Sequence, residues 1–368
     1  MQAWQGMSPG LVSVVIPTFN RAYCLPRAVD SALGQTHGNV EVIVIDDGSS
    51  DGTGEMIKSR YGAEPRVVYH YQANSGIAGA RNAGLARATG DYVALLDSDD
   101  EWSAWKLELQ LACMRAHPEL GMTWTDMVAI DPDGKVINPA YLRQMYSAYR
   151  WFPTSDSLFT GAEPLPAIAP PGATGTSTIP PGRKFHYGDI GSQMLMGNLV
   201  HTSTVVLTRA RAAAVKSFRE DLRFAGEDYE FHLRTCRLGP VGYLDVASIL
   251  YRRGRSDQAT VSSNGIHMAQ NFLRVIEPII MKEGAQTKLP QAMQNAVLAE
   301  AYAWVGEELL NHGDGAGARR ELTRSLLRQP WQARTTRLLI ASCLPAGWRG
   351  PATRMYRSVV GLNAKGSS

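Results

Sequence analysis

Two pairs of neighbouring acidic residues are the parts of this 368-residue chain best suited to chemistry. The first pair is Asp97 and Asp99, which come just after the apolar run Tyr92–Leu96. Residues two apart at the end of a strand project to the same side of the chain, so both carboxylates can reach one ligand. Carboxylate oxygens are hard ligands that select magnesium or manganese. The spacing therefore predicts a divalent-cation site at the end of this strand.

The second pair, Glu227 and Asp228, follows Gly226 and precedes a helix-like stretch. Acidic side chains at a helix N-terminus are stabilised by the helix dipole, so a purely structural role is one interpretation. The other interpretation is that Asp228 is a general base, which accepts the proton of an attacking hydroxyl group. No GxSxG string accompanies the scattered Ser and His residues, so the sequence predicts no nucleophilic triad.

The first hundred residues predict the sheet that must position these acids. Apolar runs rich in β-branched residues recur every 25 to 28 residues, with helix-like stretches between them. Because the runs are continuous rather than alternating, they suit strands covered on both faces. This spacing indicates right-handed βαβ units in a mostly parallel sheet. The expected strands are Val12–Ile16, Val40–Ile45, Val67–Tyr71 and Tyr92–Leu96, and the expected helices are Leu25–Leu33, Gly54–Tyr61 and Ile77–Ala88.

The segment that follows each expected strand is polar, turn-forming or acidic. These segments are residues 17–21, 46–51, 74–76 and 97–100. Open parallel sheets bind ligands beyond the carboxyl ends of their strands, so the four segments should converge on one ligand-binding edge. No GxGxxG follows the first strand, which argues against a dinucleotide-dependent dehydrogenase.

Four segments of the chain together form a specific pattern: VSVVIPTFNRAYCLPRAVDSALGQT (12–36), EVIVIDDGSSDGT (41–53), NSGIAGARNAGLARATGDYVALLDSDD (74–100) and GEDYEFHLR (226–234). In these segments, which occur in the family's order and span about residues 10–255, the chain resembles the family 2 glycosyltransferases. The resemblance implies a GT-A-type α/β fold, with a mostly parallel, Rossmann-like sheet flanked by helices. It also implies an inverting, Mn²⁺- or Mg²⁺-dependent transfer of a sugar from a nucleotide-diphosphate donor, UDP rather than dTDP or GDP. The acceptor would be a hydroxyl of a saccharide or lipid-linked saccharide in polysaccharide or cell-envelope synthesis.

The resemblance also implies roles for the acidic residues. Asp99 corresponds to the metal ligand, and Asp97 to a residue that binds the ribose or a metal-bound water. Asp228 corresponds to the general base. Asp47 corresponds to a contact with the base of the nucleotide, although its turn-rich surroundings also suit an Asx turn. Asp100 is a further candidate that would otherwise cap the following helix.

Other residues complete the expected site. Arg21 would lie near the phosphates or be a solvated helix-start residue, and Arg81 would reach the diphosphate from a helix N-terminus. The expected nucleotide-sugar-binding set is Pro17, Thr18, Asn20, Arg21, Asp47, Gly76, Arg81, Asp97, Ser98 and Asp99, of which Asp97 and Asp99 also bind the metal. Further candidates are Asp100, Glu227, His201 and Arg255. Many relatives carry a His, which would be a metal ligand, in the segment that contains Arg255 here. Arginines occupy this segment in the present chain, so the role of a metal ligand does not carry over to it.

The remaining sequence suggests the domain organisation. We expect an N-terminal tail at 1–10, a GT-A-type domain at 11–258 and a helical C-terminal extension with a basic amphipathic tail at 259–368. Within the domain, residues 139–191 hold eight of the twenty prolines and predict an irregular acceptor-side insertion. Residues 299–330 loosely resemble one tetratricopeptide-like helical hairpin, and one copy does not make an array.

Charge is concentrated at the C-terminal end. From residue 319 onward there are ten Lys or Arg and one acid, a net +9, whereas the other 318 residues carry 27 basic and 33 acidic residues, a net −6. Such a tail suits peripheral association with an anionic membrane surface. Alternatively it packs on the catalytic domain or docks a partner protein. Trp102 and Trp105 suit a core or sugar stacking better than a nucleic-acid platform, so no nucleic-acid partner is expected.

The sequence also suggests a cellular setting and competing functions. Four well-separated cysteines, no secretory signal and no apolar run of about 20 residues predict a cytoplasmic protein, peripheral on the inner face of the cytoplasmic membrane. A nucleotidyltransferase of similar fold is one alternative, but the Gly/Lys-rich phosphate loop of that class is missing. A non-catalytic sugar-nucleotide-binding scaffold with a partner-binding tail is another, and the intact acids Asp97, Asp99 and Asp228 argue against it.

Overall fold

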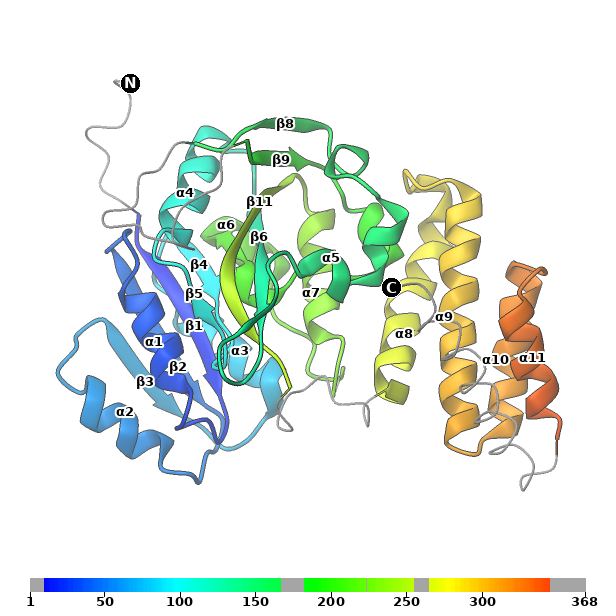
Figure 1. Ribbon diagram of the computed structural model, residues 1–368, viewed down its shortest axis with the longest axis horizontal. Helices are drawn as coiled ribbons and strands as arrows, with labels where there is room; N and C mark the ends of the chain where they lie inside the picture. The colour runs from blue at the N-terminus through cyan, green and yellow to red at the C-terminus, as the bar shows by residue number, and fades with distance from the viewer. Residues whose placement is uncertain (1–9, 167–181, 223, 255–264, 345–368) are drawn as a thin grey trace. The chain divides into compact units, whose positions relative to one another are not determined.

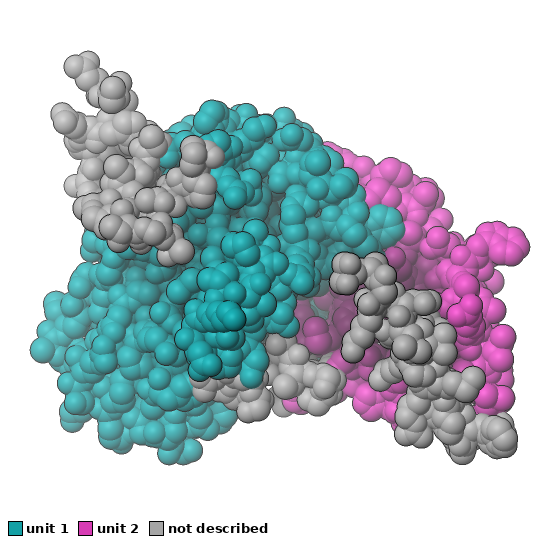
Figure 2. All heavy atoms as spheres, viewed as in Figure 1, with its two compact units in different colours: residues 1–223, 227–257 teal, residues 224–226, 258–368 magenta. Residues whose placement is uncertain are grey.

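The computed structural model describes residues 10–166, 182–222, 224–254 and 265–344. The chain forms two compact units (Figure 2), one of residues 1–223 and 227–257 and the other of residues 224–226 and 258–368. The division at 257/258 lies one residue from the domain boundary expected from the sequence.

The first unit is built on one mixed sheet with helices packed against it (Figure 1). Within the described residues its main strand order is β3-β2-β1-β4-β10-β6-β11-β9-β8. Strands β3, β2, β1 and β4 are parallel to one another, as the βαβ spacing predicts, and β10 then runs antiparallel to β4. The strands of the parallel half are β1 (Val12–Thr18), β2 (Val40–Asp46), β3 (Val67–Tyr71) and β4 (Tyr92–Leu95).

Close helix packing holds the parallel half together. Every residue of β1 is buried, because β1 lies between β2 and β4 and is covered by helix α3. A Cβ atom at Gly84 of α3 would lie only 2.2 Å from the Cγ1 of Val15, so glycine is needed for this approach. The helices of this half are α1 (Leu25–Leu33), α2 (Thr53–Tyr61) and α3 (Gly76–Arg87).

The mixed half of the sheet brings together strands from distant parts of the chain. The long strand β11 runs parallel to β6 and antiparallel to β9 and to the short strand β5. Around β11 a core cluster includes Trp105, Leu109, Phe185 and Leu244. The elements of this half are β5 (Glu101–Trp102), α4 (Lys106–Ala116), β6 (Met122–Ile130), β7 (Val136–Asn138), α5 (Leu142–Met145), β8 (Gly161–Pro164), β9 (Lys184–Gly188), β10 (Val206–Thr208), α6 (Arg209–Val215), α7 (Glu227–Arg237) and β11 (Val241–Arg252).

The predicted irregular insertion at 139–191 contains regular structure, so that part of the prediction is wrong. Strands β8 and β9 form an antiparallel pair, and β9 adds this pair to the main sheet through β11. The prolines do not prevent the pairing, because Pro164 ends the edge strand β8, where a missing N–H costs little. The proline-rich residues 167–181 lie outside the described part of the chain.

The second unit is helical in its described residues, as expected. Helices α9 and α10 pack closely because Gly306 of α9 leaves room for Leu322 of α10. Leu338 of α11 joins the same core, so part of the predicted basic amphipathic segment packs within this unit. None of the helices described is both long and apolar enough to span a membrane. The helices are α8 (Gly265–Glu283), α9 (Gln291–Asn311), α10 (Gly315–Arg328) and α11 (Ala333–Ser342).

Candidate active site

The acidic turn after β4 separates the two acids of the predicted cation motif. The Asp100 N–H donates to the Asp97 carbonyl over 3.0 Å, which folds residues 97–100 into a tight turn. Asp99 forms an ion pair with Arg21, with 2.6 Å between Oδ2 and Nη1. Asp97 instead pairs with Arg81, with 2.8 Å between Oδ1 and Nη2. Each acid is therefore held by an arginine from a different segment.

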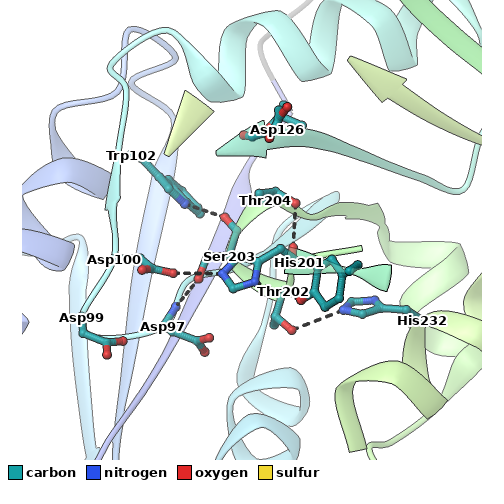
Figure 3. Close-up of polar contacts among 12 residues, drawn as sticks. Asp97, Asp99, Asp100, Trp102, Asp126, His201, Thr202, Ser203, Thr204 and His232 are labelled. Carbon is teal, nitrogen blue, oxygen red and sulfur yellow. Dashed lines mark hydrogen bonds and ion pairs between the residues drawn. The ribbon is translucent and has the colours of Figure 1, made fainter. Parts of the chain in front are cut away.

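A different set of three residues forms a candidate metal site. Asp97, Asp100 and His201 each offer one ligand atom, and these atoms lie within 4.8 Å of one another. His201 Nε2 is 3.3 Å from Asp100 Oδ2 (Figure 3). Two carboxylates and an imidazole are a plausible ligand set for a divalent cation. The sequence named Asp97 and Asp99 as ligands; the structure groups Asp97 with the two further candidates Asp100 and His201.

Burial sets the protonation of this group. Burial raises the pKa of Asp100 to about 6, while its hydrogen bond with His201 works against the rise. Burial acts to lower the pKa of His201, but the Asp100 carboxylate outweighs it and the pKa is raised. Both shifts favour a proton on this pair, so a cation that binds the two side chains must displace that proton.

The short turn His201–Thr204 connects the cation site to the interior of the sheet. The Ser203 hydroxyl accepts the Asp97 N–H over 3.1 Å, and the Ser203 carbonyl accepts the Trp102 indole N–H over 2.8 Å. Thr202 Oγ1 is 3.3 Å from Nε2 of His232 on α7 (Figure 3). Of the four residues in this turn, only His201 was predicted from the sequence. Three successive hydroxyl residues before the apolar residues 205–207 were the available signal.

Arg81 is buried and pairs with two carboxylates. Its Nη1 is 2.9 Å from Glu227 Oε1, and its Nη2 binds Asp97 as described above. The sequence predicts that Arg81 faces a diphosphate; in the structure its guanidinium links two carboxylates. Burial and the neighbouring Asp228 raise the pKa of Glu227 to about 7. Arg81 therefore joins helix α3 of the parallel half to the N-terminus of α7.

Asp228 differs from the other carboxylates of this group in its lack of polar partners among the described residues. It is half-buried in the first turn of α7, and no side chain or backbone group of the described residues forms a hydrogen bond or ion pair with it. Its charge nevertheless acts on Arg81, Glu227 and His201, which places it at the same site. Its position in the first turn also agrees with the helix-dipole interpretation.

The loops after β1 and β2 are hydrogen-bonded to each other. The Asn20 backbone N–H donates to Ser49 Oγ and its side-chain Oδ1 accepts from the Ser50 N–H, each over 2.8 Å. Asn20 has a φ of 52°, an αL conformation that asparagine tolerates well. The Thr18 hydroxyl is buried and has no hydrogen-bond partner among the described residues. Pro17 lies within β1 opposite Ile45.

Asp47 holds the loop before α3. Its carboxylate accepts the backbone N–H groups of Ser75, over 2.9 Å, and Gly76, over 2.8 Å, as well as the Gln72 side-chain amide. This is the local, turn-stabilising role that the sequence left open beside a contact with a base. Ser98 is buried within the acidic turn, and Arg255 lies outside the described residues.

Comparison with known proteins finds similar sequences over the N-terminal part of the chain. Residues 13–161 match the family model "Glycosyl transferase family 2". A chondroitin synthase of Pasteurella multocida is 41% identical over 131 residues, which are 36% of this chain and 14% of that protein. The putative teichuronic acid biosynthesis glycosyltransferase TuaG of Bacillus subtilis is 45% identical over 105 residues, 28% of this chain and 42% of the relative. The matches thus span less than half of each relative.

Solved structures show the same architecture over most of the chain. Residues 1–349 of S. aureus TarS in complex with UDP-GlcNAc align with a TM-score of 0.55 at 18% identity, covering 90% of this chain and 84% of that one. The mannosyltransferase PcManGT of Pyrobaculum calidifontis, in complex with GDP-Man and Mn²⁺, aligns with a TM-score of 0.51 at 16% identity, covering 98% and 90%. The sheet unit has a GT-A-type α/β fold, and residues 13–161 within it match glycosyltransferase family 2.

Proposed function

We propose that this protein is an inverting, metal-dependent glycosyltransferase that moves a sugar from a UDP-sugar to a hydroxyl of a saccharide or lipid-linked saccharide. The observation that carries the proposal is the carboxylate of Asp228, which has no hydrogen-bond or ion-pair partner among the described residues, beside the group Asp97, Asp100 and His201. The site then offers both a proton acceptor and ligands for a cation. The nucleotide sugars bound in the TarS and PcManGT structures support a nucleotide-sugar donor.

The proposed reaction needs no enzyme nucleophile. Asp228 takes the proton of the acceptor hydroxyl while the hydroxyl oxygen attacks the anomeric carbon of the donor sugar. The nucleoside diphosphate leaves from the opposite side, so the anomeric configuration is inverted. Glu227 is tied to Arg81, so the neighbouring Asp228 is the acid left to act as the base. A divalent cation, when held by Asp97, Asp100 and His201, would neutralise the negative charge of the leaving diphosphate. The softer imidazole ligand favours Mn²⁺ over Mg²⁺.

The acceptor and the location are inferred from relatives and charge. The chondroitin synthase and TuaG matches support a polysaccharide acceptor. We place the protein in the cytoplasm, peripheral on the inner face of the membrane. In the described part of the tail, Leu327 is 79% and Trp331 95% exposed beside several arginines, which suits an anionic interface. Residues 345–368 of that tail lie outside the described residues.

Vesicle flotation tests the membrane part of the proposal. The full chain should float with anionic vesicles at low salt and be released at high salt, because screening weakens the attraction. Trp331→Ala with Leu327→Ala should weaken flotation, and Val136→Ala with Ile137→Ala, two exposed apolar residues of β7, is the matched control. A chain that stays unbound at low salt would show that the tail has only a structural or protein-binding role.

A thermal-shift screen of nucleotide sugars with and without Mn²⁺ tests the catalytic part. A UDP-sugar should raise the melting temperature more with Mn²⁺ than without it, because a ligand that binds only the folded state stabilises it by mass action. Slow hydrolysis of the same donor would exclude the non-catalytic scaffold. Stabilisation by nucleoside triphosphates and sugar phosphates instead of nucleotide sugars would favour the nucleotidyltransferase.

A further inference from the structure

Tyr146 comes from the segment predicted to face the acceptor, but its hydroxyl reaches the candidate cation site. It lies between α5 and a 3-10 turn at Ser147–Trp151. Its hydroxyl oxygen is 3.2 Å from Nδ1 of His201, and the two rings are tilted with centroids 6.4 Å apart. The sequence analysis did not select Tyr146, because nothing near it in the sequence indicates this long-range contact.

The imidazole of His201 is therefore held at both nitrogens. Nδ1 faces Tyr146, and Nε2 faces Asp100 at 3.3 Å. The ring of Tyr251 packs edge-on against the imidazole, with centroids 5.0 Å apart. His201 itself is buried, so its ring orientation is decided by these neighbours rather than by solvent.

The hydroxyl of Tyr146 suits both protonation patterns of this ring. The hydroxyl of a tyrosine keeps its hydrogen at neutral pH, because its ordinary pKa is about 10. A protonated hydroxyl can both donate and accept a hydrogen bond. When Nε2 carries the hydrogen, the hydroxyl can donate to Nδ1. When the Nε2 lone pair faces a cation, Nδ1 carries the hydrogen and the hydroxyl oxygen accepts it.

We propose that Tyr146 is a positioning residue that orients His201 for the cation and thereby couples the acceptor-side segment to the donor site. The proposal rests on the metal-dependent function proposed above. Because Tyr146 belongs to the segment after α5, the cation and this segment should stabilise each other through one hydrogen bond. Binding of the donor and its cation would then order the surface that receives the acceptor.

Tyr146→Phe tests the proposal, because it removes only the hydroxyl. We expect its Kd for Mn²⁺, measured by electron paramagnetic resonance of the free ion, to rise about 10- to 100-fold, the range found for outer-shell partners of metal ligands. Tyr149→Phe is the matched control. Tyr149 is buried in the same segment, and its hydroxyl donates to the Leu199 carbonyl over 2.7 Å. The control should lose stability without losing Mn²⁺ affinity.

Hydrogen exchange supplies the second measurement. Mn²⁺ with UDP should slow amide exchange in residues 142–151 of the unsubstituted chain and of Tyr149→Phe, but much less in Tyr146→Phe. Unchanged Mn²⁺ affinity in Tyr146→Phe would overturn this proposal without affecting the proposed function. An equal loss of Mn²⁺ affinity in Tyr146→Phe and Tyr149→Phe would do the same. An unsubstituted chain that binds no Mn²⁺ would overturn both this proposal and the metal dependence of the proposed function.

Discussion

The two halves of the sheet contribute differently to the site. In the parallel half, the acids are tied within the loops that carry them or to a nearby arginine: Asp47 holds the loop before α3, and Asp99 is paired with Arg21. In the mixed half, the groups facing the site are His201, Tyr146 and Asp228, which come from three separate segments. The parallel half thus provides a preformed edge, whereas the mixed half assembles the reacting groups through long-range contacts.

Asp228→Asn should give the largest effect and tests whether the mixed half supplies the base. The amide keeps the shape of the side chain but loses its basicity, so transfer should fall by about 10²- to 10⁴-fold while donor affinity is kept. Steady-state kinetics with a donor-binding isotherm measure the two separately. A loss confined to donor affinity or stability would instead assign Asp228 to the helix N-terminus.

Arg81→Met breaks the link between the halves. The substitution leaves the buried Glu227 and the half-buried Asp97 without their cation, and breaking a buried ion pair typically costs about 3–5 kcal/mol of unfolding free energy. Denaturant unfolding measures it. Arg87→Met on the same helix is the control, because Arg87 is exposed and its loss should cost no more than about 0.5 kcal/mol. A stable Arg81→Met variant with weakened donor binding would favour the predicted diphosphate contact.

Asp99→Ala and Asp100→Ala compare the sequence-based and structure-based metal ligands. If the structural grouping is right, Asp100→Ala raises the Mn²⁺ Kd by about 10²-fold, at least as much as losing an outer-shell partner. Asp99→Ala mainly frees Arg21 and should change the Kd less. Isothermal titration calorimetry gives both values. The reverse order would show that Asp99 is the ligand and that its pairing with Arg21 gives way to the cation.

The pH dependence of the cation site should be the smallest effect. The pKa values of Asp100 and His201 are both raised in the folded state. Protonation of these two groups therefore stabilises the metal-free fold, and this contribution is lost as the pH rises through about 6 and above. Mn²⁺ affinity should rise over the same range, because the cation displaces the proton. In Asp100→Asn, both the fall in melting temperature and the rise in Mn²⁺ affinity with increasing pH should be lost. An unchanged profile in Asp100→Asn would place the titration elsewhere.

The parallel half was largely predictable from sequence because its strands, helices and acidic turns follow one another locally. The acidic turn follows β4, as the sequence predicts, but the separation of Asp97 from Asp99 was not predictable, because the arginines that hold the two acids come from elsewhere in the chain. The grouping of Asp100 with His201 depends on contacts across about a hundred residues. The same holds for Tyr146 and for the β8–β9 pair, where composition alone suggested irregular structure.

Gly84 imposes a constraint on mutational tolerance far from the reacting groups. Gly84 lies three residues after Arg81 on α3, so both face the same side of the helix. A methyl group at Gly84 would collide with Val15 of β1 and push the helix away from the sheet. The displaced helix would carry the Arg81 guanidinium with it and pull on Asp97 and Glu227 together. Among variants that keep a folded core, substitutions at this packing contact should therefore be selected against for activity as well as for stability.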